Sequence, residues 1–258
     1  MSDTTSVSNR RAPDSGYVQK MYDGLLSKLP DGYTAFRWQQ TTVSRFHYRQ
    51  SRRVLVRALR AVPVQVNRAL EVGGGSGAWT GFFAGRTKHL DFVDISESML
   101  AEARVALESF KNITYIHADI MAWEPQENVY ELAISLRNIE YMQDKRLVLH
   151  RISGALVPGG RLILSTKNPE FDWNGYFANK PLHGGQVSLR ELQGLLTESG
   201  FVIERVYPAI IGKKIKYAAM RAFWDVLQSL ALRLPPAAMP LFLLRRISES
   251  FLVVARRS

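Results

Sequence analysis

A cluster of glycines is the part of the sequence best suited to hold a ligand. Gly73, Gly74, Gly75 and Gly77 follow the sequence Arg-Ala-Leu-Glu-Val at 68–72, which we predict to be a strand. A glycine loop that leaves a strand and opens a helix can direct its peptide N–H groups toward a ligand beyond the strand ends. Tight turns also use glycine for its backbone freedom alone, so the cluster needs support from other residues.

Two carboxylates fall where they could face that loop. Asp94 ends the next predicted strand, 21 positions after Gly73, and a carboxylate there can accept both hydroxyl protons of a ribose. Asp119 follows the third predicted strand. Because the carboxyl ends of parallel strands meet at one edge of a sheet, we expect both side chains at that edge. The set fits a dinucleotide and S-adenosylmethionine alike.

The residue at position 71 separates these two ligands. Glu71 places a carboxylate beside the loop, in the sequence Glu-Val-Gly-Gly-Gly-Ser-Gly over 71–77. A negative charge there would repel a pyrophosphate, whereas it would attract a ligand that carries a cationic amino group and a sulfonium. The residues therefore favour S-adenosylmethionine.

With these residues in place, the chain resembles the class I S-adenosylmethionine-dependent methyltransferases. The resemblance runs through the segments 71–77, 90–104, 117–120 and 156–165, and it covers about residues 65–205. It implies an enzyme that binds S-adenosyl-L-methionine as its cofactor and transfers the methyl group.

The resemblance also implies roles for the residues around the methionine part of the cofactor. Glu71 would act on its amino acid end. Gly73, Gly75 and Gly77 would let the loop approach the methionine portion.

On the adenosine side, the resemblance implies that Asp94 holds the ribose hydroxyls and that Ile95 packs on adenine. Asp119 would accept a hydrogen bond from the adenine amino group, and Ile120 would flank the ring. Structural alternatives stay open. Glu71 and Asp119 could instead solvate strand ends or cap helices, and the two isoleucines could simply pack in the core.

Residues after the fourth and fifth predicted strands would meet the acceptor. The resemblance implies that Leu136 and Arg137, after the fourth strand, line the floor near the methyl group, with Leu136 among the cofactor-binding residues. If the acceptor is a hydroxyl, a general base helps, and His183, in the loop after the fifth strand, is the candidate catalytic residue. Glu140 is a rival, although Tyr141 stands where many relatives have histidine, which weakens a base role for that segment.

Alternating apolar patterns predict an α/β fold. We expect a doubly wound, Rossmann-like, seven-stranded and mostly parallel sheet, with N-terminal helices and a helical insertion before the last strand. The predicted strands lie at 68–72, 90–94, 113–117, 131–136, 161–166, 201–206 and 251–255. The predicted helices lie at 17–29, 41–61, 78–86, 97–107, 145–156 and 189–199.

The same patterns divide the chain into three parts. Residues 1–60 are expected to form a tail and a helical cap. Residues 61–208 would form the S-adenosylmethionine-binding domain, and 209–258 a helical insertion followed by the final strand.

Basic residues exceed acidic residues by 11, and the excess sits at the two ends. The net charge is +7 over 1–60, −4 over 61–204 and +8 over 205–258. Phosphate contacts to a nucleic acid would account for such charge. However, 135–138 lacks the Asn/Asp-Pro-Pro-aromatic turn common in enzymes that methylate base amino groups. A nucleic acid is therefore a disfavoured partner, and an RNA methyltransferase is kept as an alternative.

The insertion at 209–248 points to a different acceptor. Basic residues at one end of an apolar, aromatic stretch suit a helix that rests on an anionic membrane surface or encloses an apolar acceptor. A helical lid or a dimer surface is the structural alternative. We expect O-methylation of a small-molecule or lipid-linked acceptor; a non-catalytic binding module of this family is the remaining alternative.

The absence of cysteine excludes disulfides, zinc–thiolate sites, iron–sulfur clusters and a cysteine nucleophile. No metal site is predicted. Residues 1–9 are polar and lack the pattern of a targeting segment. We expect a cytoplasmic protein with a peripheral position at the inner membrane surface, and the oligomeric state is left open.

Overall fold

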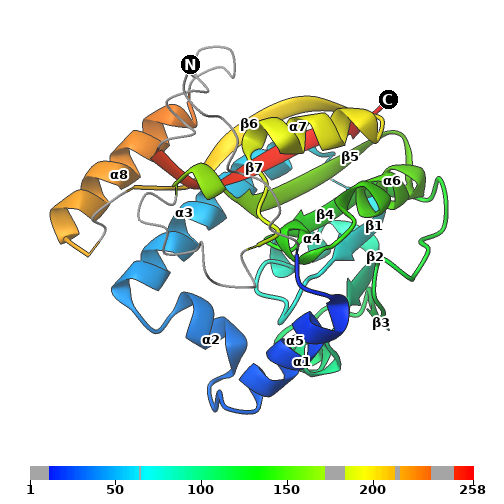
Figure 1. The fold of residues 1–258 in the computed structure, drawn as a ribbon, viewed down its shortest axis with the longest axis horizontal. Helices are drawn as coiled ribbons and strands as arrows, with labels where there is room; N and C mark the ends of the chain where they lie inside the picture. Colours follow the sequence, from blue (N-terminus) through cyan, green and yellow to red (C-terminus); the bar gives the residue numbers. More distant parts are fainter. Residues whose placement is uncertain (1–11, 64, 172–183, 213–215, 234–246) are drawn as a thin grey trace, which may run out of the picture.

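A seven-stranded sheet forms the centre of the computed structural model, which describes residues 12–63, 65–171, 184–212, 216–233 and 247–258 (Figure 1). Its strands are β1 Val66–Val72, β2 Thr87–Asp94, β3 Ile113–His117, β4 Tyr130–Leu136, β5 Leu156–Lys167, β6 Phe201–Ile211 and β7 Ser248–Arg257. All seven predicted strands are confirmed. The predicted fold class is confirmed as well.

The strand order, β3-β2-β1-β4-β5-β7-β6, sets the place of the site. β1 to β5 pair in parallel, and β7 runs antiparallel to both β5 and β6. The chain moves outward from β1 in one direction and then resumes from β4 in the other. In sheets of this kind the crevice for a ligand opens at the carboxyl ends of the two strands where the order reverses.

Helices cover the sheet on both faces (Figure 1). They are α1 Ser15–Leu26, α2 Gly32–Trp38, α3 Thr42–Ala58, α4 Gly81–Ala84, α5 Glu97–Ala106, α6 Lys145–Ala155, α7 Leu189–Glu198 and α8 Ala218–Ala231. Short 3-10 turns lie at η1 Leu59–Ala61, η2 Ile139–Tyr141 and η3 Pro169–Phe171. The helices predicted at 97–107, 145–156 and 189–199 start and end within a residue or two of α5, α6 and α7.

The structure departs from the predicted elements at three places. The helix expected at 78–86 is reduced to the four residues of α4, because turns occupy 78–80 and glycines stand at 81 and 85. The helix α2 was not predicted, since seven residues are too few to show a helical period. The strand predicted at 161–166 begins earlier, at Leu156, and its pairing with β4 skips from Leu156 to Arg161.

Alternate residues of the central strands pack into two separate cores. Leu162 and Leu164 of β5 join the cluster that contains α6 and α7, whereas Ile163 joins the cluster that contains α3. All three side chains are fully buried. A strand buried on both faces holds its register firmly, because a slip by one residue would exchange the two cores. A fixed register also fixes the positions at which the carboxyl ends of the strands lie.

The predicted insertion before β7 begins with α8, which packs against α3 and β6. Gln228 of α8 is fully buried and donates to the carbonyl of Ala209 at 3.0 Å. Residues 234–246 of the insertion lie outside the described part of the chain. Among the described helices, none combines the length and apolar character needed to cross a bilayer.

Candidate functional site

The glycine loop after β1 requires glycine at several of its positions. Gly73, Gly75 and Gly77 have φ angles of 68°, 58° and 77°, in the left-handed region that L side chains rarely adopt. A Cβ at Gly73 would lie 2.0 Å from the Asn138 side chain, and one at Gly77 would lie 2.7 Å from Leu107. The loop can follow this path only with glycine at these positions.

Asp94, at the end of β2, holds the loop in place. Its Oδ2 accepts a hydrogen bond from the backbone N–H of Gly75 at 2.8 Å, and its Oδ1 accepts one from Ser96 at 3.0 Å. The residue is buried. Burial raises the pKa of the Asp94 carboxyl, while the backbone hydrogen bonds act in the opposite direction. The carboxylate therefore links the loop, the end of β2 and the start of α5.

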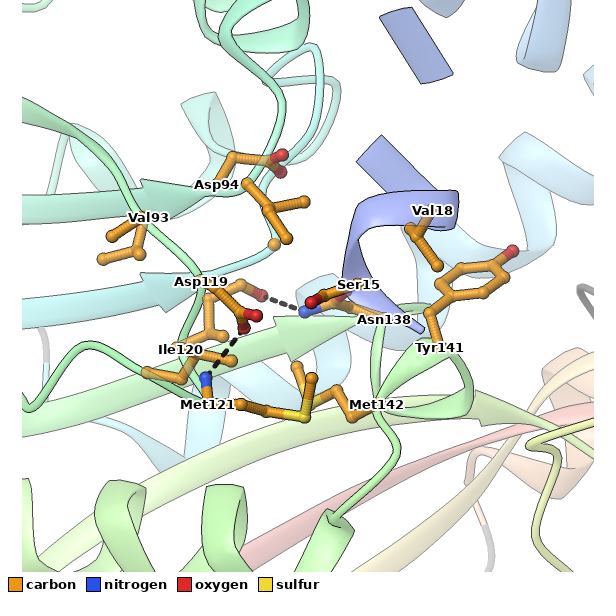
Figure 2. Close-up of a pocket in the computed structure, with 14 residues that line it drawn as sticks. Ser15, Val18, Val93, Asp94, Asp119, Ile120, Met121, Asn138, Tyr141 and Met142 are labelled. Atoms are coloured by element: carbon orange, nitrogen blue, oxygen red, sulfur yellow. Dashed lines mark hydrogen bonds between the residues drawn. The ribbon is translucent and has the colours of Figure 1, made fainter. Parts of the chain in front are cut away.

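Two adjoining cavities open at this edge of the sheet. They share six lining residues, which come from α1, the loop, the end of β2 and the segment after β4: Val18, Gly73, Asp94, Ile95, Asn138 and Tyr141. The first cavity, shown in Figure 2, extends toward Asp119, Ile120 and Met121. The second, of about 120 Å³, extends toward Leu136, Arg137 and Lys167.

Most of the predicted cofactor residues line these cavities. Asp119 and Ile120 line the first, Gly75 and Leu136 line the second, and Gly73, Asp94 and Ile95 line both. Asp119 Oδ1 accepts a hydrogen bond from the backbone N–H of Met121 at 2.8 Å (Figure 2). Ile120 belongs to the hydrophobic core as well. Core packing and cavity lining are thus both observed for this residue.

Glu71 and Gly77 do not occur among the described residues that line either cavity. The Glu71 carboxylate is buried below the loop, where Thr80 donates a 2.8 Å hydrogen bond to its Oε2. Burial raises the pKa of Glu71 to about 8. In the structure Glu71 therefore supports the turn that leads into α4.

The N-terminal helices supply a wall that the sequence did not predict. Val18 and Tyr22 of α1 and Tyr33, Arg37 and Trp38 of α2 all line the second cavity. Their spacing is that of ordinary amphipathic helices. Their place at the site follows only from the way these helices fold back onto α5.

Side chains of the α5 region hold the two helices in that position. Glu102 of α5 accepts the backbone N–H groups of Tyr33 at 2.9 Å and Thr34 at 3.2 Å, in the first turn of α2. Asp23 of α1 accepts the hydroxyl of Ser96, the N-cap of α5, at 2.6 Å. The carboxylate of Glu102 thus caps a helix whose own N-cap side chain makes no such bond.

The second cavity ends in a group of cations. Arg37, Arg137 and Lys167 line it together. Arg137 has a φ angle of 60°, and its N–H donates to the carbonyl of Ser165 at 2.9 Å. Burial, followed by the positive charge of Arg137, lowers the pKa of Lys167 to about 7. Lys167 could have been found from the sequence, since it ends β5 at the same sheet edge.

The predicted catalytic residue His183 lies outside the described residues. Its rival Glu140 is fully buried with an oxygen 3.5 Å from Arg137 Nε, and it does not line either cavity. Tyr141 lines both cavities, and burial raises its pKa, with Glu140 adding to the shift. Among the described residues, no group of three or more His, Asp or Glu side chains is placed to hold a metal ion.

Comparison with known proteins identifies the central part of the chain. A family model described as a methyltransferase domain matches residues 69–160. Malonyl-[acyl-carrier protein] O-methyltransferase 2 of Ilyobacter polytropus is 29% identical over 104 residues, which are 40% of this chain and 40% of that protein. The matched region therefore spans well under two thirds of the length of this relative.

Two solved structures share the fold over nearly the whole chain. The N-methyltransferase NodS of Bradyrhizobium japonicum, in complex with S-adenosyl-L-homocysteine, has a TM-score of 0.62 at 16% identity, covering 92% of this chain and 98% of NodS. The [4+2]-cyclase SpnF has a TM-score of 0.68 at 17% identity, covering 96% and 97%. The family model thus assigns residues 69–160 to a methyltransferase domain family, and the sheet that contains them has the fold of S-adenosylmethionine-dependent methyltransferases such as NodS.

Proposed function

We propose that the chain transfers the methyl group of S-adenosylmethionine to an oxygen of a small-molecule or lipid-linked acceptor. The observation that carries this proposal is the double role of Asp94. Its carboxylate holds the glycine loop through Gly75 and also lines both cavities. A loop fixed in this way presents a wall without side chains next to a carboxylate, as a ribose and an amino acid require.

The residues present fit the cofactor. Asp94 would hold the ribose hydroxyls, and the apolar side chains of Ile95 and Ile120 would face adenine, with Asp119 near its amino group. Near Gly75 the first atom that an added Cβ would meet is the sulfur of Met99, at 4.0 Å. The loop therefore leaves room for the methionine portion.

When bound, S-adenosylmethionine supplies a methyl group that its sulfonium has already activated. The chain has to hold an acceptor oxygen in line with the methyl–sulfur bond and to exclude water; such positioning can lower a barrier by up to about 7–11 kcal/mol in model reactions. The cofactor would supply this methyl group to the acceptor oxygen and leave as S-adenosyl-L-homocysteine, so the chain's own part is to give the acceptor proton a path to solvent or to a base. His183 is proposed as that base.

Oxygen as the methylated atom is supported by the name of one relative, the malonyl-[acyl-carrier protein] O-methyltransferase. The similarity to NodS, an N-methyltransferase, concerns the fold. SpnF carries the name of a cyclase on the same fold. Fold alone therefore does not decide the reaction.

A lipid-linked acceptor is supported by the exposed face of α8. Phe223, Val226 and Leu230 lie on one side of the helix and are 54%, 60% and 52% exposed. An adjoining groove is lined by arginines of α3 and its C-terminal turn, with one more after α8: Arg49, Arg52, Arg53, Arg57, Arg60 and Arg233. Two of them, Arg49 and Arg53, pair with Asp225. Apolar side chains beside a row of cations suit an anionic membrane surface.

Vesicle co-sedimentation tests this membrane association. Wild type is expected to bind vesicles that contain phosphatidylglycerol, and a Phe223→Ser, Leu230→Ser variant to bind them far less. A variant with Val105→Ser and Val202→Ser, which changes exposed apolar residues elsewhere, is the matched control. Equal binding by all three proteins would contradict the membrane proposal.

The methyl transfer is tested with two measurements. Calorimetry with S-adenosyl-L-homocysteine should show saturable binding. A radiolabelled transfer screen against separated lipid, small-molecule and RNA fractions of a cell extract should label the lipid or small-molecule fraction. Label in RNA would favour the alternative acceptor, and binding without any transfer would identify a binding module or a different reaction.

A further inference from the structure

A third, smaller cavity continues the second one into the core beneath α3. Four residues line both spaces: Trp38, Trp79, Leu136 and Arg137. Beyond these, the walls of the third cavity come from α3 and from the strands β5, β6 and β7. Its volume is about 20 Å³, which is room for one group of about the size of a water molecule. The shared walls make the third cavity an inner extension of the second.

Apolar side chains form most of this inner extension. Leu55 of α3, Ala209 of β6 and Leu252 of β7 line it, and all three are buried. At its junction with the second cavity, Trp38 and Trp79 pack edge to face, with ring centroids 5.0 Å apart. Apolar walls that include two indole rings suit a flat apolar group, because such rings pack well against other rings.

One hydroxyl group in these walls has no partner. Ser250 of β7 is 1% exposed, and its Oγ makes no hydrogen bond with any residue that the structure describes. Ser250 lies two positions before Leu252, so both side chains point to the face of the sheet that α3 covers. A buried hydroxyl that has lost its bonds to water is unfavourable until another group replaces them. The Ser250 hydroxyl is thus free to bond a group that enters the cavity.

Two nearby serines show what is particular to Ser250. Ser165 of β5 also lines the third cavity, but its Oγ already accepts the backbone N–H of Arg137 at 3.1 Å. Ser248 of β7 is fully buried and likewise has no partner among the described residues, but it lines none of the three cavities. Ser250 combines an unsatisfied hydroxyl with a place in the cavity wall.

We propose that the third cavity binds a small hydrogen-bonding substituent on an aromatic ring of the methyl acceptor, with Ser250 as its partner. The ring would lie in the second cavity against Trp38 and Trp79, and the substituent would enter the inner extension. A serine hydroxyl both donates and accepts hydrogen bonds, so it can bond a second hydroxyl. This inference rests on the proposed function and names the class of acceptor: an aromatic compound that carries a hydroxyl group.

Titration with three small aromatic probes tests the proposal. Benzene, toluene and phenol are added separately to the chain, with and without saturating S-adenosyl-L-homocysteine. Binding is followed by nuclear magnetic resonance of the indole N–H groups of Trp38 and Trp79, which line both cavities. Toluene and phenol differ by a methyl in place of a hydroxyl, so the ratio of their dissociation constants measures the preference for a hydrogen-bonding substituent.

Variants link this preference to the named residues. Ser250→Ala should shift the ratio against phenol by about three- to tenfold, the effect of one neutral hydrogen bond. Ser248→Ala is the matched control, because it removes a buried and unpartnered hydroxyl from the same strand outside the cavities, and it should leave the ratio unchanged. Ala209→Val is an independent test, since it narrows the third cavity: toluene and phenol should bind several-fold more weakly, and benzene should be unaffected.

Several outcomes would overturn the assignment of Ser250. They are an unchanged ratio in Ser250→Ala, an equal shift in Ser248→Ala, and a failure of all three probes to bind. A crystal structure with phenol in which a water stays on Ser250 and the ring lies elsewhere would identify a water site only. Displacement of phenol by S-adenosyl-L-homocysteine would assign the space to the cofactor and would also overturn the proposal.

These outcomes are distinguishable from a failure of the proposed function. Absence of S-adenosyl-L-homocysteine binding would contradict the methyl transfer. The titrations without S-adenosyl-L-homocysteine would still measure the ratio for wild type, Ser250→Ala and Ser248→Ala, and so would still test the cavity.

Discussion

The backbone N–H of Gly75 donates a 2.8 Å hydrogen bond to Oδ2 of Asp94, which joins the loop after β1 to the end of β2. The other oxygen of the same carboxylate accepts from Ser96, where α5 begins. A single buried side chain thus fixes three segments around both cavities. Removal of this side chain therefore has consequences for the site that can be measured.

Replacement of Asp94 by alanine should reduce cofactor affinity much more than stability alone would explain. Hydrogen bonds to charged groups contribute about 1.5–3 kcal/mol each, so we expect S-adenosyl-L-homocysteine to bind on the order of 100-fold more weakly in calorimetry. Asp91→Asn is the control. Asp91 lies on the same strand and is also buried, but it bonds Arg68 and Tyr130 away from the cavities. Equal losses in both variants would contradict a specific role for Asp94.

Substitution of Gly73 by alanine should disrupt the site. The new Cβ would overlap the Asn138 side chain, and the φ of 68° would be strained. We expect a lower melting temperature and a loss of cofactor affinity of about tenfold or more. Gly154→Ala is the control, because nothing lies within 4 Å of its Cβ position in α6. That variant should be neutral or more stable by up to about 1 kcal/mol.

Glu71→Gln should change how stability depends on pH. The pKa of Glu71 is raised to about 8 by burial, so the folded chain keeps the proton that the unfolded chain releases above its ordinary pKa. The stability linked to Glu71 is present below that ordinary value and is lost as the pH rises toward about 8. We expect urea unfolding to show that, as the pH rises across this interval, the free energy of unfolding of the glutamine variant increases relative to that of wild type. The increase should be on the order of a few kcal/mol. Parallel curves would contradict the raised pKa.

The strands and most of the cavity lining could be predicted because they depend on local patterns. Ile163 lies between Leu162 and Leu164 in a short apolar run that suits a strand buried on both faces. Asp94 and Asp119 follow strand ends, so the parallel topology alone brings them to one edge. For each of these residues, the sequence immediately around it is enough to predict where it lies in the sheet.

The cap over the site could not be predicted in this way. Arg37 and Trp38 reach the cavity because Glu102, 65 positions beyond Arg37, caps the first turn of α2. No local pattern encodes that contact. Glu71 has the residue type expected for a ligand contact, but the turn toward α4 places its carboxylate next to Thr80 below the loop.

Removal of the Glu102 carboxylate should loosen that cap. Glu102→Ala leaves the N–H groups of Tyr33 and Thr34 without their acceptor, and we expect a loss of about 1–2 kcal/mol in stability and a several-fold weaker affinity for S-adenosyl-L-homocysteine. Limited proteolysis should cut the chain faster between α1 and α3. Glu97→Ala, an exposed change on the same helix, is the control. Unchanged proteolysis would show that α2 is held by its apolar contacts alone.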